Sequence, residues 1–136
     1  MKHYLVDTNV VIDMLLNREG ADAACAVIDG AERGEYALHL CALSFTNIYY
    51  SLRKMLSHSD RISCLMQLQE VLHVLPVDAS VINAALCSDW SDFEDAVQNF
   101  TAVSDGRITG IITRNTKDFQ KSSLEILDSK VFIKRN

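Results

Sequence analysis

The stretch Tyr4-Leu5-Val6-Asp7-Thr8-Asn9 determines how the rest of the chain is interpreted, because a short apolar run ends in an aspartate. The run predicts a buried strand, and the apolar residues within 10–15 continue with helical spacing. In open parallel sheets, ligands bind outside the carboxyl ends of the strands, so the Asp7 carboxylate is placed for chemistry. Helix capping by Asp7 or Thr8 is the alternative interpretation. The two are separated by asking whether carboxylates from other strand ends reach the same crevice.

Length and composition predict one globular domain. The chain has 136 residues, 49% hydrophobic and 23% charged, so we expect residues 1–136 to form a single domain with its own core. No apolar run of about 18 residues is present, and the first residues lead straight into a strand. We therefore expect no membrane contact and a cytoplasmic location. The net charge of −5 argues against broad electrostatic affinity for nucleic acid, so such a partner would be contacted locally.

The four cysteines do not form a pattern typical of a metal site. Their spacing contains no close pair, and they lie mostly among apolar residues: Cys25, Cys41, Cys64 and Cys87. We expect reduced thiols in the core.

The order of apolar segments predicts the fold class. Strands are expected near residues 4–6, 36–41, 72–77 and 108–113, with one more short strand within 124–133. Single or paired helices separate them, which is typical of an α/β fold with three layers, α/β/α, around a parallel sheet of four to five strands. Right-handed crossovers then bring the loops after Val6, Cys41 and Thr113 to one edge of the sheet.

Helix starts are predicted from capping residues. We expect Ser44 to cap the helix after the second strand, which places Asn47 in its first turn. Ser59 or Asp60 is expected to cap the following helix.

An acidic cluster, Ser91-Asp92-Phe93-Glu94-Asp95, begins the helix predicted to end near Val103. Ser91 and Glu94 match a capping box, and Asp92 is favourable near the positive end of the helix dipole. Capping does not explain Asp95, which lies on the same helix face as Asp92. A carboxylate on a helix that packs closely on a sheet is either paired or bound to a ligand.

A third carboxylate comes from the polar loop after the strand of residues 108–113. Asp118 lies in this loop, which also has a simpler interpretation as a polar turn. Asp7, Asp95 and Asp118 would then converge from distant parts of the chain. Like charges so gathered raise one another's pKa unless a cation neutralises them. Mg²⁺ or Mn²⁺, which prefer oxygen ligands, would suit such a site.

Four segments together resemble a PIN domain: VDTNVVIDML (6–15), SFTNIYY (44–50), DFEDAVQ (92–98) and IITRNTKDF (111–119). The resemblance spans nearly the whole chain. It implies a parallel sheet and an acidic cluster holding one or two Mg²⁺ or Mn²⁺ ions that cleave single-stranded RNA. Many bacterial members are the toxin ribonuclease of a toxin-antitoxin pair, so the resemblance also implies an antitoxin protein as partner and a homodimer.

The resemblance assigns site residues one by one. It implies catalysis and metal binding by Asp7, Asp95 and Asp118, with Asn115 and Asn47 as further metal-site residues. The flanking polar positions Asn9 and Thr113 match the family pattern, and Arg114 and Lys117 lie where they could neutralise substrate phosphates.

Asn47 departs from the family pattern, which has a glutamate or aspartate there. An amide can offer a carbonyl oxygen to a metal but removes one negative charge from the site and cannot act as a base. The alternative function is therefore a catalytically weakened or inactive PIN-fold module that binds RNA or protein. A phosphoacceptor receiver domain is disfavoured because no aspartate follows the strand of residues 36–41, and a nucleotide cofactor because no glycine-rich turn follows the first strand.

Overall fold

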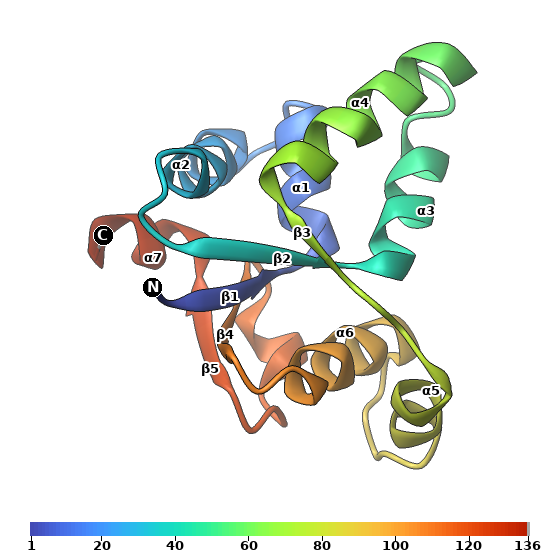
Figure 1. The fold of residues 1–136 in the computed structure, drawn as a ribbon, viewed down its shortest axis with the longest axis vertical. Helices are drawn as coiled ribbons and strands as arrows, with labels where there is room; N and C mark the ends of the chain where they lie inside the picture. The colour runs from blue at the N-terminus through green and yellow to red at the C-terminus, as the bar shows by residue number, and fades with distance from the viewer. Residues whose placement is uncertain (136) are drawn as a thin grey trace.

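The computed structural model describes residues 1–135 and contains a five-stranded sheet. The sheet lies at the centre of the molecule (Figure 1). All neighbouring strands are parallel, in the order β3-β2-β1-β4-β5. The strands are β1 (His3–Val6), β2 (Ala37–Cys41), β3 (His73–Leu75), β4 (Ile108–Thr113) and β5 (Glu125–Asp128). The predicted α/β class and parallel sheet are confirmed.

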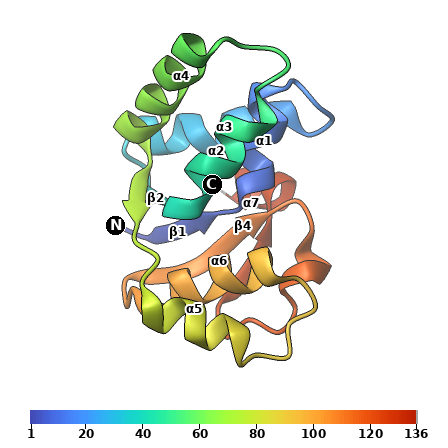
Figure 2. The same ribbon diagram turned by 90° about the vertical axis from the view of Figure 1, so that its right-hand side faces the viewer.

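Helices cover both faces of the sheet, which gives the predicted three layers (Figures 1 and 2). One face packs against α1 (Thr8–Leu15), α2 (Ala21–Glu32), α3 (Ala42–Ser51), α4 (His58–Val71) and α7 (Ser129–Arg135). The other packs against α5 (Ala79–Leu86), α6 (Phe93–Ser104) and the short 3₁₀ helix η1 (Thr116–Phe119). Within residues 1–135, no helix has the length and apolar character needed to cross a membrane.

The alternating side chains of the strands divide the core in two. Along β1, Tyr4 and Val6 pack into the cluster under α1–α4, whereas Leu5 packs into the cluster over α6. Both sides of the central strands are thus buried, as expected for a parallel sheet covered by helices on two faces.

The start of α3 differs from the prediction. Strand β2 passes directly into α3, with Cys41 as N-cap, so Ser44 lies inside the helix and is not its cap. Ser44 is buried, and its hydroxyl lies 2.6 Å from the hydroxyl of Thr8. Asn47 consequently lies in the second turn of α3 and not in the first. The prediction failed because the chain makes no loop between strand and helix.

Two other caps were also assigned to the wrong residue. Ser57, not Ser59 or Asp60, caps α4, and its side chain accepts the Asp60 N–H at 3.1 Å. Asp92, not Ser91, caps α6 by accepting the Asp95 N–H at 2.9 Å. Each predicted cap was a residue or more from the true one, because several cap-forming side chains stand in a row and only the backbone conformation selects between them.

The cysteine prediction holds for the thiols, which are all free, but only in part for their place in the core, in which Cys41 is buried and against which Cys64 packs. Cys41 is buried, Cys64 is partly buried, and Cys25 and Cys87 are exposed; all four are free thiols. Helix α2 buries Ala24 and Val27 against the sheet, and Cys25 lies on the outward side of the same apolar segment.

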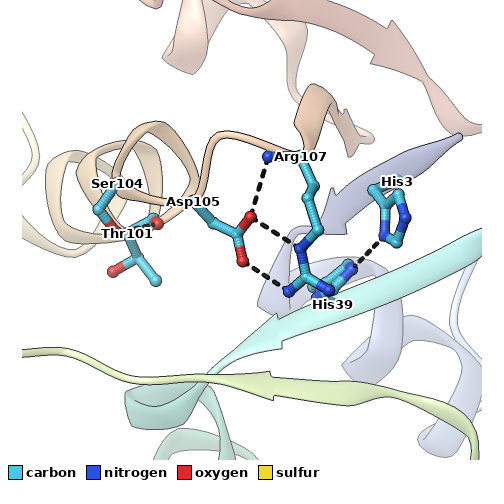
Figure 3. A network of polar contacts seen from close by, with 6 residues as sticks. All are labelled: His3, His39, Thr101, Ser104, Asp105 and Arg107. Atoms are coloured by element: carbon cyan, nitrogen blue, oxygen red, sulfur yellow. Dashed lines mark hydrogen bonds and ion pairs between the residues drawn. The ribbon is translucent and has the colours of Figure 1, made fainter.

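A polar cluster lies at the edge of the sheet where the strands begin, opposite the edge that is formed by their carboxyl ends (Figure 3). His3 Nδ1 lies 2.9 Å from Nε2 of buried His39, and Arg107 forms a 2.7 Å ion pair with Asp105. Burial, together with positive neighbours such as His73, lowers the pKa of His39 to about 4. His39 is therefore neutral at physiological pH.

Candidate functional site

The candidate site lies at the edge of the sheet where the strands end. Three helix amino termini surround it: α1 follows β1, α3 follows β2, and α6 approaches from the other face (Figure 2). Because unpaired N–H groups and the positive ends of helix dipoles point toward it, this edge favours negatively charged groups.

Asp7 is fixed at the centre of this edge. It is only 1% exposed, and its backbone N–H donates to the Ile112 carbonyl at 2.9 Å. Its carboxylate accepts hydrogen bonds from Gln98 Nε2 at 3.0 Å, Thr113 Oγ1 at 2.8 Å and the Asn9 N–H at 3.4 Å. The last bond makes Asp7 the N-cap of α1, so the capping interpretation is also correct. Burial raises the pKa of Asp7, and the hydrogen bonds from Thr113 and Gln98 oppose that rise.

Gln98 connects three helices and was missed by the sequence reasoning. Its Nε2 donates to Asp7, while its Oε1 accepts the Thr8 N–H at 3.0 Å and lies 3.1 Å from the Thr8 hydroxyl. Thr8 in turn contacts Ser44 in α3. The available signal was spacing, because Gln98 follows Asp95 by three residues and therefore lies on the same face of α6.

Asp95 lies half-buried beside this network. Burial raises its pKa to about 7, with further contributions from the negative charges of Asp92, Asp7 and Asp118. A carboxyl group with this pKa exchanges its proton near neutral pH. After burial, the negative charge gathered around Asp95 also favours its protonated form.

A cavity of about 230 Å³ at this edge, here called the acidic cavity, collects several of the predicted residues. Its lining includes Asp7, Asn9, Asn47 and Asp95, together with Glu94, Gln98 and others. Asp118 is exposed and does not line it, although its charge acts on Asp95. Within residues 1–135, no three His, Cys, Asp or Glu side chains are placed to hold one metal ion as they stand. The structure thus gathers two of the three predicted carboxylates in the cavity itself.

The remaining predicted residues follow β4. Thr113 is buried, donates to Asp7, and accepts the Asn115 N–H at 3.0 Å, so it supports the cavity from beneath. Arg114 Nε donates to Asp13 Oδ2 at 2.6 Å. Lys117 is exposed in η1. Neither cation lines the acidic cavity.

Asp13 is a second residue that the sequence reasoning missed. It is 2% exposed in α1, and its Oδ1 has no hydrogen-bond partner among residues 1–135. The ion pair with Arg114 therefore offsets most of the free-energy cost of burying the Asp13 carboxylate. The same ion pair holds the first residue after β4 against α1.

A family model described as "PIN domain" matches residues 3–117. The chain belongs to the PIN domain family. The matched range includes β1 through β4 and every strand end that contributes to the acidic cavity of this PIN domain. The predicted resemblance is confirmed.

Solved structures of low sequence identity share the fold of this PIN domain. A toxin-antitoxin complex from Klebsiella pneumoniae matches with a TM-score of 0.68 and 18% identity, covering 93% of this chain and 97% of the other. VapBC2 from Rickettsia felis, bound to a DNA fragment from its promoter, gives 0.65 and 14%, covering 93% and 97%. FitAcB from Neisseria gonorrhoeae gives 0.66 and 16%, covering 93% and 98%. A search of curated proteins found no match.

Proposed function

We propose that this PIN domain is a metal-dependent endoribonuclease that cleaves single-stranded RNA and acts as the toxin of a toxin-antitoxin pair. The observation that carries the proposal is the pairing of buried Asp7 with Asp95, whose pKa is raised to about 7, in one cavity at the strand ends. PIN domains are in general nucleases, and the structural neighbours come from toxin-antitoxin systems.

The donor set fits a hard divalent cation. Mg²⁺ is usually held by one or two carboxylates and keeps several waters, so Asp7 and Asp95 suffice as direct ligands. Asn47 and Asn115 would act as neutral oxygen donors or orienting groups, and Asp118 would bind directly or through water. The raised pKa values of Asp7 and Asp95 are compatible with this assignment. Burial is the main cause for both, and at Asp95 the neighbouring carboxylates add to it, so a cation would stabilise the ionised form of each.

The bound ion would lower the pKa of a water molecule and stabilise negative charge on the departing oxygen. The chain's own residues perform the positioning. Thr113 and Gln98 hold the Asp7 carboxylate in one orientation, and Asn9 adds its backbone N–H. Arg114 and Lys117, at the rim of the same sheet edge, would contact substrate phosphates.

The partners follow from the same proposal. An antitoxin protein would cover the acidic cavity, as the neighbours' toxin-antitoxin complexes suggest. A homodimer would bury exposed apolar side chains on α3, α4 and the segment between them, where Tyr50, Met55 and Met66 are each more than 60% exposed. We take residues 1–136 as one domain that contains the whole site.

Asn47 favours a second candidate function. With an amide where the family pattern has a carboxylate, the cavity holds less negative charge and binds a cation more weakly. The chain would then be a PIN-fold module that binds RNA or protein without efficient cleavage.

Cleavage of single-stranded RNA in Mn²⁺ separates the two functions. We expect metal-stimulated cleavage by the natural chain and its loss in Asp7→Asn and Asp95→Asn, with Asp60→Asn as a control carboxylate remote from the cavity. Asparagine is also a good N-cap, so Asp7→Asn retains the start of α1. Calorimetric titration with Mn²⁺ reports binding independently of cleavage. Absence of both Mn²⁺ binding and cleavage would reject the nuclease and leave the binding module.

A further inference from the structure

A second cavity adjoins the acidic cavity and has a different character. It measures about 220 Å³ and shares four lining residues with the acidic cavity: Thr8, Asn47, Glu94 and Gln98. The rest of its wall comes from the first two turns of α3 and α6 and from the end of β2: Cys41, Leu43, Ser44, Thr46, Phe93 and Val97. We call it the side pocket. The two cavities are therefore adjacent.

The side pocket is apolar at its floor and aromatic at its mouth. Cys41 and Val97 are buried, whereas Phe93 is 48% exposed and Leu43 43% exposed. Phe93 is the first residue of α6 and does not belong to either core cluster. A half-exposed phenyl ring beside a cavity offers a flat surface for stacking.

Asn47 gives the side pocket an uncommitted amide, beside the equally uncommitted carboxylate of Glu94. The Asn47 backbone carbonyl accepts the Ser51 hydroxyl at 2.9 Å, but its side-chain amide makes no hydrogen bond to any of residues 1–135. The neighbouring hydroxyl groups are already engaged: Ser44 with Thr8, and Thr46 with the Leu43 carbonyl. The Asn47 amide can therefore turn its oxygen toward the proposed cation and donate an N–H to the edge of a ligand.

We propose that the side pocket binds one unpaired base of the RNA, stacked on Phe93 and contacted at its edge by Asn47; this rests on the proposed function. Drug-sized ligands fill pockets of roughly 300 Å³ or more, so 220 Å³ suits a single ring system and not a whole nucleotide. Unpaired bases are recognised by stacking on aromatic side chains and by hydrogen bonds to their edges.

Charge also favours base recognition. The chain has a net charge of −5, and the acidic cavity adjoins the side pocket, so contacts with phosphates add little to its affinity for RNA. Contacts with bases must therefore supply much of that affinity. An apolar side chain of a peptide would fit the volume but would leave the Asn47 amide without a partner. The base uses both the aromatic and the polar wall.

The first test measures binding without cleavage. In an Asp95→Asn background with Mn²⁺, RNAs carrying the fluorescent base 2-aminopurine at successive positions are titrated with protein. We expect quenching at one position and a loss of affinity of about 5- to 150-fold on Phe93→Ala, the range for removing one stacked base. Phe93→Tyr retains stacking and binds within about twofold. Val103→Ala, an exposed apolar position on the same helix, is the matched control and leaves affinity unchanged.

The second test removes the base instead of the side chain. RNAs with one abasic position are cleaved by the natural chain and by Phe93→Ala. We expect an abasic site at one position to slow cleavage by the natural chain by about 5- to 150-fold. The same abasic site should not slow cleavage by Phe93→Ala any further. If RNA is neither bound nor cleaved, the proposed function fails and takes this inference with it. If RNA is cleaved but neither Phe93→Ala nor any abasic position matters, only the base assignment is overturned, and a peptide side chain becomes the better occupant.

Discussion

Replacing Asp95 by asparagine should stabilise the protein at alkaline pH in the presence of a chelator. Burial, and then the charges of Asp92, Asp7 and Asp118, raise the pKa of Asp95 to about 7, whereas an unfolded aspartate titrates near about 3.9. Between these values the folded state binds more protons than the unfolded state. The contribution of Asp95 to the free energy of unfolding is therefore highest below about pH 4 and is lost as the pH rises to and through 7.

The size of the effect follows from the same two values. The gap between them corresponds to roughly 4 kcal/mol, which solvent screening of this half-exposed carboxyl reduces to about 1–2 kcal/mol. We expect the free energy of unfolding of Asp95→Asn to exceed that of the natural chain by about 1–2 kcal/mol at pH 8. The difference should be smaller at pH 5.

Urea unfolding at pH 5 and pH 8 in chelator measures this difference. Asp60→Asn is a close control, because Asp60 is the third residue of α4 as Asp95 is of α6, and both donate a backbone N–H to a capping side chain. Asp60→Asn should not reproduce the gain. Equal stability of Asp95→Asn and the natural chain at pH 8, or a gain that does not depend on pH, would refute the electrostatic reasoning.

Adding Mn²⁺ should make the natural chain more stable than Asp95→Asn, the reverse of the order expected in chelator. A ligand that binds only the folded state stabilises by about 2.7 kcal/mol at one hundred times its dissociation constant. The natural chain should gain more than Asp95→Asn, because the cation replaces the repulsion around this carboxylate with attraction. Melting temperatures of both proteins with increasing Mn²⁺ measure this difference, and identical shifts would show that Asp95 is not a ligand.

Three further substitutions test buried contacts, two beside the site and one in the core under α2, each by urea unfolding. Arg114→Met should cost about 1–3 kcal/mol because it leaves buried Asp13 without its ion pair, and Asp13→Asn in the same chain should recover part of the loss. Gln98→Leu should cost about 2–3 kcal/mol, since it leaves the buried Thr8 N–H without its acceptor and removes one of the three hydrogen bonds to the Asp7 carboxylate. Gly30→Ala should cost about 1–3 kcal/mol because a methyl group there would overlap the Tyr36 ring; no loss would mean that the ring moves freely.

Much of the fold was predictable because the segments carry strong periodic patterns. The buried strands and the alternation with helices predicted the parallel sheet, and the sheet in turn placed Asp7 at the correct edge. Helix starts were less predictable. At Ser44, a favourable capping residue was overridden by the direct passage of β2 into α3, which sequence periodicity does not reveal.

The candidate site was predicted in outline and not in its supporting contacts. Asp7 and Asp95 lie in one cavity as expected. The position of Asp7 was predicted from the end of a strand, and that of Asp95 from the face of a helix. Gln98 and Asp13 were missed, since their importance comes from burial and from partners about 90 and 100 residues away in the chain. Phe93 was quoted only as part of a motif, and its exposure beside a cavity is visible only in three dimensions.

The direct passage from β2 into α3 limits how this protein can be altered. With Cys41 closing the strand and Ala42 opening the helix, no spacer residues exist to absorb an insertion or deletion. One added residue would rotate α3 by about 100° relative to the strand and swing Asn47 away from both cavities. Changes at this junction are therefore restricted to substitutions. The segment between α3 and α4, in contrast, can change in length without rotating the α3 residues that line the two cavities.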